Sequence, residues 1–228
     1  EPILGYGIKG MIWYQGENNT RDPKAYQTLF PAMITMMRED WGQGDFPFYW
    51  VQLADFKFEK EEPGPDNWAE LREAQTMVLD KLPNVGQAVI YDTGEVYSIH
   101  PKNKQVPAHR LARHALVKNY GLEMPCESPR FESMTIEGSK AVLDFKYVTK
   151  ELHSFDSKVI EGFQIAGEDQ KFVWAEAKAV DKDTIEVWSE SIPHPVAVRY
   201  AWEINPKANV FDRGSLPLTP FRTDNWEH

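Results

Sequence analysis

The chain has 228 residues, of which 42% are hydrophobic and 13% aromatic, and its formal net charge is −10. This length suits one large domain or two small ones, and the apolar content excludes a disordered chain. An acidic surface repels phosphate backbones, which excludes nucleic acid as a favoured partner, and no apolar run approaches the roughly 20 residues that cross a bilayer.

The first half of the chain alternates strand-like and helix-like segments. Residues 8–14 (IKGMIWY) predict a buried strand, because the segment is short and apolar. The next segment predicts a helix with Asp22 as its N-cap, Pro23 at its first position and Gly42 as its C-terminal stop. Two further strands and two further helices follow in alternation, at residues 47–53, 71–82, 85–91 and 104–120. This order favours a parallel sheet with helices on both faces.

In the second half of the chain the pattern of apolar residues changes from alternating strands and helices to short strands alone. Six short segments read as strands separated by turns, at residues 131–137, 140–147, 159–166, 171–177, 184–189 and 196–202. This spacing is typical of an antiparallel β-sandwich. We therefore predict an α/β part over residues 1–125 and a β-rich part over residues 126–228, with the boundary near residues 124–129.

Two polar clusters follow predicted strands. Gln15, Glu17 and Asn18 come after the first strand, and Asp92 and Glu95 come after the third. In open parallel sheets, ligands bind outside the carboxyl ends of the strands. These clusters are therefore either ordinary polar turns or the two sides of a site, in which the Gln15 amide could donate to an oxyanion.

A loop histidine extends the second cluster. His100 precedes Pro101, which pushes its backbone toward extended geometry. It is either a surface histidine or a general base, since an imidazole ordinarily titrates near neutral pH. Glu17 also invites a paired-carboxylate interpretation with Asp92 or Glu95, as in glycoside hydrolysis.

The cysteine, histidine and aromatic residues bear on metal and sugar sites. Cys126 is the only cysteine, which excludes an internal disulfide and a thiolate-rich zinc site. The histidines lack metal-binding spacing, His109 and His114 are interpreted as structural, and no metal or cofactor is predicted. The aromatic residues of the sandwich are either core, as strand aromatics commonly are, or a sugar-binding face: Phe163, Phe172, Trp174, Trp188, Tyr200 and Trp202.

Several blocks together resemble one family. Residues 10–19 (GMIWYQGENN) resemble the WYQGE(S/A)N block of the sialate O-acetylesterase family, within the SGNH-hydrolase superfamily. Residues 98–101 (SIHP), followed by Lys104-Gln105 and Arg110-Leu111-Ala112, resemble the IHP block that supplies that family's catalytic histidine. The resemblance continues through residues 161–167 (EGFQIAG), 197–202 (AVRYAW) and 220–224 (PFRTD), and so spans nearly the whole chain.

The resemblance implies a serine-esterase mechanism on a partial three-layer SGNH-type sheet followed by a sandwich-like region. A serine attacks an acetyl ester, a histidine takes its proton, and amide donors hold the oxyanion. By resemblance His100 is the base, Gln15 lies in the oxyanion region, and Glu17 and Asn18 shape the site. The substrate would be an acetylated carbohydrate such as sialic acid, no cofactor is needed, and the location would be extracytoplasmic.

Two departures from the family pattern shape the expectation. The GQSNM-like block that carries the nucleophile is missing, and Ser98 does not match it. The chain therefore resembles the C-terminal part of an esterase, a processed product or a cut piece, whose partner is the N-terminal remainder of the same enzyme. It begins with neither Met nor a signal-peptide pattern. Alone it is expected to be inactive, with self-association or an exposed groove beside residues 8–14.

The second departure concerns the triad acid. The superfamily's DxxH pattern would put an aspartate at position 97, where this chain has Tyr97. Asp92, Glu95 or a backbone carbonyl could orient His100 instead. A non-catalytic carbohydrate-binding or interaction fragment remains the alternative function, and a carboxylate-pair glycosidase is the third.

Overall fold

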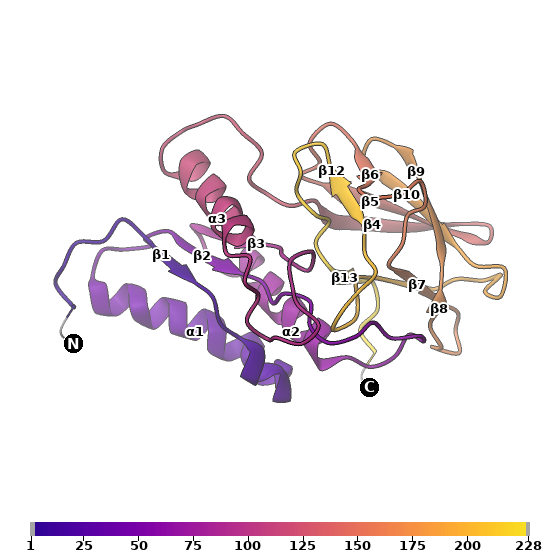
Figure 1. Ribbon diagram of the computed structural model, residues 1–228, viewed down its shortest axis with the longest axis horizontal. Helices are drawn as coiled ribbons and strands as arrows, with labels where there is room; N and C mark the ends of the chain where they lie inside the picture. Colours follow the sequence, from indigo (N-terminus) through magenta and orange to yellow (C-terminus); the bar gives the residue numbers. More distant parts are fainter. Residues whose placement is uncertain (1–2, 227–228) are drawn as a thin grey trace.

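A computed structural model describes residues 3–226, in which a helix-covered sheet lies beside a β-rich region (Figure 1). Residues 1–2, at the start of the chain where the sequence shows no signal-peptide pattern, and residues 227–228 lie outside the described residues. Within the described part of the chain, no helix combines the length and the apolar character that crossing a membrane requires.

The helix-covered sheet has three parallel strands. They are β1 (Met11–Trp13), β2 (Phe48–Val51) and β3 (Val85–Ala88), with β2 in the middle. All three carboxyl ends therefore reach the same edge of the sheet, and the segments that follow them begin at residues 14, 52 and 89.

Three α-helices cover the two faces of this sheet. They are α1 (Pro23–Trp41), α2 (Asn67–Thr76) and α3 (Gln105–Lys118). Helices α1 and α2 pack with Phe48 and Trp50 on one face, whereas α3 packs with Tyr49 and Val51 on the other. The alternation of β2 side chains thus serves both layers, and the predicted parallel sheet with helices on both faces is confirmed for these strands.

Local capping explains the helix boundaries. The Asp22 carboxylate accepts the Ala25 N–H at 2.9 Å, and Gly42 ends α1 in the left-handed conformation. Two short 3₁₀ helices were not predicted. One, η1 (Glu17–Arg21), contains part of the polar cluster after the first predicted strand, and the other, η2 (Met77–Asp80), lies within the helix predicted at residues 71–82.

The prediction that residues 8–14 form a buried strand is wrong for β1. Ile12 is 68% exposed. The reason is that β1 pairs with β2 alone among the described strands, while α3 packs over β2 and β3. An apolar strand edge is consequently open to solvent.

The β-rich region contains two four-stranded antiparallel sheets and a two-stranded pair. One sheet has the order β4 (Arg130–Glu137), β5 (Lys140–Lys146), β10 (Thr184–Trp188) and β9 (Glu176–Asp181). The other has the order β13 (Phe221–Arg222), β11 (Ala197–Tyr200), β7 (Phe163–Ala166) and β8 (Val173–Trp174). The pair consists of β12 (Val210–Asp212) and β6 (Leu152–Ser154). Side chains of both large sheets share one core, as a sandwich requires.

One predicted strand proves to be two. The segment 171–177 breaks at Ala175, where the chain passes from β8 in one sheet to β9 in the other. The short strands β6, β12 and β13 were not predicted, because two or three residues carry too little periodicity.

Buried polar contacts join the two regions. The Arg72 side chain of α2 is fully buried and donates to the backbone oxygens of Leu53, Ala54, Glu203 and Ile204 at 2.6 to 3.1 Å. The predicted boundary near residues 124–129 falls in the irregular segment between α3 and β4. The division at that point stays a prediction.

Candidate active site

Residues that follow β1 and residues of the loop that carries His100 line one cavity of about 190 Å³, whose lining does not include Asp92 or Glu95. Tyr14, Gln15 and Glu17 form one side, and the other side includes His100 and Lys104. The structure therefore brings three of the sequence-predicted residues together at the carboxyl edge of the sheet. Asn18 is exposed on η1 and is not among the lining residues.

The Gln15 side chain is held at both ends. Its Nε2 donates to Asn19 Oδ1 at 2.6 Å, and its Oε1 accepts from the Tyr26 hydroxyl at 3.2 Å. The Gln15 backbone oxygen accepts from Gln75 Nε2 at 3.2 Å, while Gln75 Oε1 accepts the N–H of Leu53, just after β2. The amide is thus fixed in place, and one of its two N–H groups remains to serve a ligand.

Gly16 is required by this arrangement. Its φ is 149°, and an added Cβ would lie 3.1 Å from both the Gln75 amide nitrogen and a Leu71 methyl. Glycine at this position lets the chain leave β1 and turn into η1.

The loop that carries His100 is closed on itself. The His100 N–H donates to Ser98 Oγ at 3.2 Å, and the Ser98 hydroxyl donates to the His100 carbonyl at 3.1 Å. Glu95 Oε1 accepts the Lys102 N–H at 2.8 Å. His100 itself is exposed, and no hydrogen bond within residues 3–226 holds its imidazole. The ring is therefore available for proton transfer, whereas Ser98 is committed to the loop.

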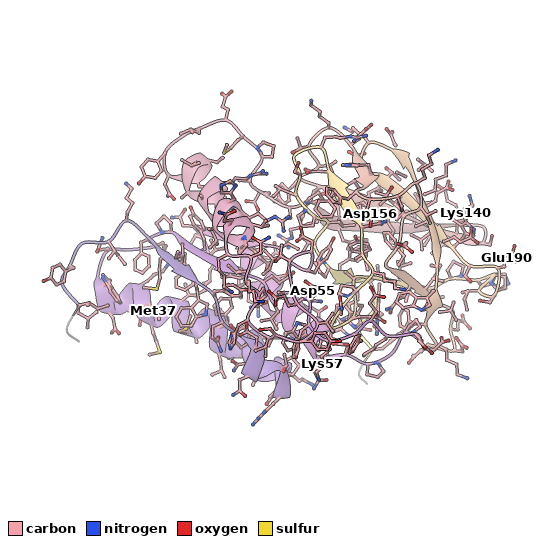
Figure 2. The ribbon with its side chains drawn as sticks, viewed as in Figure 1. Met37, Asp55, Lys57, Lys140, Asp156 and Glu190 are labelled. Atoms are coloured by element: carbon pink, nitrogen blue, oxygen red, sulfur yellow. The ribbon has the colours of Figure 1, made fainter. Side chains whose placement is uncertain are left out.

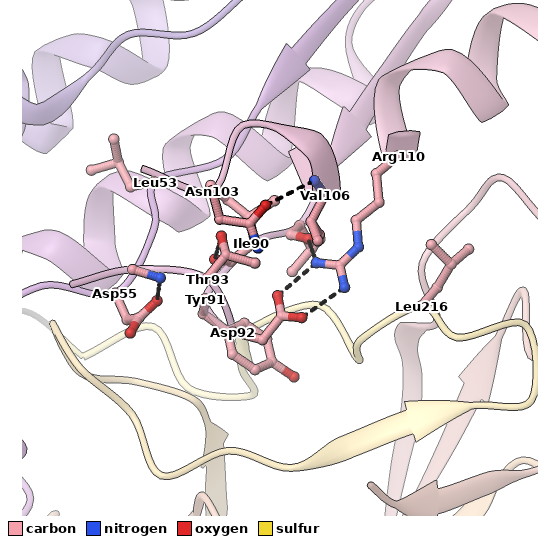
Figure 3. Close-up of polar contacts among 12 residues, drawn as sticks. Leu53, Asp55, Ile90, Tyr91, Asp92, Thr93, Asn103, Val106, Arg110 and Leu216 are labelled. Carbon is pink, nitrogen blue, oxygen red and sulfur yellow. Dashed lines mark hydrogen bonds and ion pairs between the residues drawn. The ribbon is translucent and has the colours of Figure 1, made fainter. Parts of the chain in front are cut away.

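Asp92 is bound by an arginine (Figure 3). Arg110 of α3 forms a two-pronged ion pair with it, Nη1 to Oδ1 at 2.6 Å and Nη2 to Oδ2 at 2.7 Å, and also donates to the Val89 carbonyl at 2.6 Å. Arg110 is only 7% exposed. The pair joins the segment that follows β3 to α3, and the carboxylate that the sequence favoured for orienting His100 already has a strong partner.

Asp55 is a site residue that the sequence reasoning missed. Its carboxylate accepts the Gly94 N–H at 2.5 Å, and burial raises its pKa. An added Cβ at Gly94 would lie 1.9 Å from the Asp55 carbonyl oxygen. The loops after β2 and β3 are therefore locked together. The signal was present, because Asp55 follows a predicted strand just as Asp92 does.

Tyr14 and Lys104 were also missed. The Tyr14 hydroxyl is buried without a hydrogen-bond partner, and Lys104 Nζ lies 4.8 Å from the centre of its ring. Burial, with smaller contributions from the charges of Glu17 and Asp55, raises the pKa of Tyr14 to about 12. Carboxylates of Glu17 and Asp55 therefore lie near the buried Tyr14 hydroxyl, and Lys104 lines the cavity.

A separate group of side chains could hold a metal ion. Ligand atoms of His114, Cys126 and Glu127 lie within 4.8 Å of one another. His114 is fully buried, however, with Nε2 3.0 Å from the Gln87 carbonyl, and Glu127 is ion-paired with Lys118 at 2.5 Å. These contacts agree with a structural role for His114, away from the cavity at His100.

Comparisons with known proteins agree with the resemblance seen in the sequence. Residues 3–100 match the family model described as carbohydrate esterase, sialic acid-specific acetylesterase. The sialate O-acetylesterase of Homo sapiens is 29% identical to the chain over 245 residues, and the match covers 96% of this chain and 46% of that protein. The sialate O-acetylesterase of Mus musculus is 29% identical over 249 residues, and the match covers 96% of this chain and 45% of that protein. The predicted resemblance to sialate O-acetylesterases is confirmed.

A solved structure is also similar. A carbohydrate acetylesterase from Xanthomonas citri matches with a TM-score of 0.92 and 43% identity, covering 99% of this chain and 52% of that one. The chain therefore spans about half the length of the relatives it matches.

Proposed function

We propose, from the resemblance to the sialate O-acetylesterases, that the chain is the C-terminal part of a carbohydrate esterase that hydrolyses O-acetyl esters by a serine–histidine mechanism. The observation that carries the proposal is the shared cavity of Gln15 and His100. A fixed amide donor and an unengaged imidazole face the same small space, as acyl transfer requires. The substrate is an acetylated carbohydrate, and the location is extracytoplasmic on the family resemblance.

The chemistry divides between this chain and the remainder of the enzyme. A serine hydroxyl from upstream attacks the acetyl carbonyl, and His100 takes its proton. The remaining Gln15 N–H stabilises the negative charge that develops on the carbonyl oxygen. His100 then gives the proton to the departing sugar oxygen, and water releases acetate from the serine by the reverse sequence. By the family resemblance, Glu17, which lines the cavity, and its exposed neighbour Asn18 shape the site.

Two features support an upstream nucleophile. The Ser98 hydroxyl donates its hydrogen bond to the His100 carbonyl, so it is not placed to attack an ester. The open edge of β1 beside the exposed Ile12 offers pairing positions for further strands from the N-terminal remainder. We therefore propose that the chain alone has no esterase turnover.

Asp92 remains our proposed orienting acid for His100. Arg110 binds both carboxylate oxygens, but each oxygen has a second lone pair that could accept an imidazole N–H. In the complete enzyme Asp92→Asn should lower kcat more than Glu95→Gln. Equal, small effects from both would favour a serine–histidine dyad with a backbone orienter.

The decisive experiment measures acetyl release by the complete enzyme. His100→Ala should lower kcat by about 10³-fold or more, and the fold should survive because His100 is exposed. His109→Ala, at another exposed histidine, on α3, is the matched control and should retain activity. Near-normal turnover of His100→Ala would remove His100 from the mechanism.

A second variant tests the oxyanion donor. Gln15→Ala should lower kcat by about 10²-fold, as expected for a donor aimed at developing charge. A rise in KM with kcat unchanged would instead assign Gln15 to ground-state binding of the sugar. A carbohydrate-binding role without catalysis would leave acetyl release undetectable in the complete enzyme.

A further inference from the structure

A second, larger cavity lies between the β-rich region and a loop of the other region. Its volume is about 560 Å³, within the usual range of ligand sites. Trp174 at the end of β8 and Trp188 at the end of β10 line it, and residues 59–61 form the opposite side. The two tryptophans come from different sheets of the sandwich.

These tryptophans differ from their aromatic neighbours. Tyr200 and Trp202, which the sequence also offered for a sugar-binding face, are at most 1% exposed and belong to the interior, and Phe163, also buried, contributes only to the floor of the cavity. Trp174 is 37% exposed, and its indole N–H donates to the Glu61 carbonyl at 2.8 Å. The Trp174 ring is therefore held in a fixed orientation while part of its surface remains open.

The charged groups around the cavity favour an uncharged ligand. Four carboxylates line it, from Glu59, Glu61, Glu161 and Glu176. The two lysines of the lining are both ion-paired, Lys60 with Asp66 and Lys207 with Glu59. An anionic ligand would meet net repulsion here, whereas neutral hydroxyl groups could donate to the carboxylates.

Two exposed aromatic side chains, from the loop before residues 59–61 and from the loop of His100, contact each other. Phe58 is 65% exposed and Tyr97 is 88% exposed, and their ring centres are 5.6 Å apart in an edge-to-face contact. Tyr97 lies three residues before His100, and Phe58 lies three residues before Glu61. Figure 2 shows Asp55 and Lys57, at the start of this loop, between the parallel sheet and the sandwich.

We propose that the cavity at Trp174 and Trp188 is a remote subsite for a neutral glycan chain. The apolar faces of one sugar ring pack on the tryptophans and its hydroxyls bind the carboxylates. The glycan passes over Phe58 and Tyr97 toward His100. This inference rests on the proposed function, because the acetylated residue of the same glycan would lie at His100.

The test measures binding without hydrolysis, so that it is independent of esterase activity. The chain and its His100→Ala variant are titrated by calorimetry with unacetylated cellohexaose, mannohexaose and xylohexaose. At least one hexaose should bind both proteins equally. Hexagalacturonic acid, which is anionic, should bind at least tenfold more weakly.

Variants locate the site. Trp174→Ala and Trp188→Ala should each weaken hexaose binding tenfold or more, while Tyr120→Ala, an exposed aromatic elsewhere, should leave it unchanged. If circular dichroism shows that a tryptophan variant has unfolded, the original chain is oxidised with N-bromosuccinimide with and without hexaose. Protection of Trp174, measured by peptide mass, then supports the subsite.

Three results would overturn the proposal. They are failure of all three hexaoses to bind, binding that survives in both folded tryptophan variants, and no protection of Trp174. None of these depends on acetyl release, whereas failure of the proposed esterase function would appear in the complete enzyme, either as no detectable acetyl release or as near-normal turnover of His100→Ala. Failures of the two ideas are therefore distinguishable.

Discussion

Glu203 provides a test of the junction between the two regions. The residue is 2% exposed, and its Oε1 has no hydrogen-bond partner among the described residues. Burial raises its pKa to about 8, with Asp66 and Glu59 adding to the rise and the Lys60 and Lys207 charges opposing it. Glu203 is therefore held protonated in the folded protein at neutral pH, and the substitution Glu203→Gln mimics that neutral form.

The sign and size of the effect follow from proton linkage. The ordinary pKa of this carboxyl is 4.5, against about 8 when folded. Between these values the folded state keeps a proton that the unfolded state releases, so the free energy of unfolding falls as pH rises through this window. At about 1.36 kcal/mol per pKa unit, the loss from Glu203 has an upper limit of roughly 5 kcal/mol by pH 8.

Urea unfolding at pH 5 and pH 8 measures this effect. Relative to the parent chain, Glu203→Gln should gain stability at pH 8 and much less at pH 5. Glu190→Gln, at an exposed carboxylate of the β-rich region, is the control and should change neither value. If Glu203→Gln and the parent lose the same free energy between the two pH values, Glu203 does not carry the buried proton.

Three further outcomes are expected. Asp92→Asn should lower the free energy of unfolding by about 1–3 kcal/mol in urea, because it leaves a buried arginine without its charge partner; an unchanged midpoint would mean that the pair adds nothing. Gly94→Ala should lower the melting temperature, since its Cβ would overlap a backbone oxygen at 1.9 Å, whereas Gly64→Ala meets nothing within 4 Å and should melt like the parent. The purified chain should release no acetate from an aryl acetate; release that depends on His100 would contradict the upstream nucleophile and make Ser98 the first serine to mutate.

The sequence predicts most of the regular structure where local chemistry decides it. Asp22, Pro23 and Gly42 place the ends of α1, because capping depends on neighbouring residues. The rule that ligands gather at the carboxyl ends of parallel strands predicts that Gln15 and His100 lie at one edge of the sheet, and in the structure both line one cavity.

What the sequence does not show depends on distant partners. Ile12 looks like a core residue until its lack of a covering neighbour is seen, and Asp92 looks free until Arg110, eighteen residues later, is folded beside it. The passage of the chain from one sheet to the other at Ala175 cannot be read from the sequence, because the alternation of inward and outward side chains continues on both sides of Ala175.

The burial of Arg72 has a consequence for how such proteins diversify. Its guanidinium, whose pKa burial lowers to about 10, is satisfied by backbone oxygens from both regions. If a β-rich region is exchanged between relatives, the new region must place two backbone carbonyls where Glu203 and Ile204 place them. Without them the buried Arg72 guanidinium would lose hydrogen-bond acceptors, which is strongly destabilising. The constraint falls on backbone path rather than side-chain identity, so recombination between distant sequences remains open wherever that path is kept.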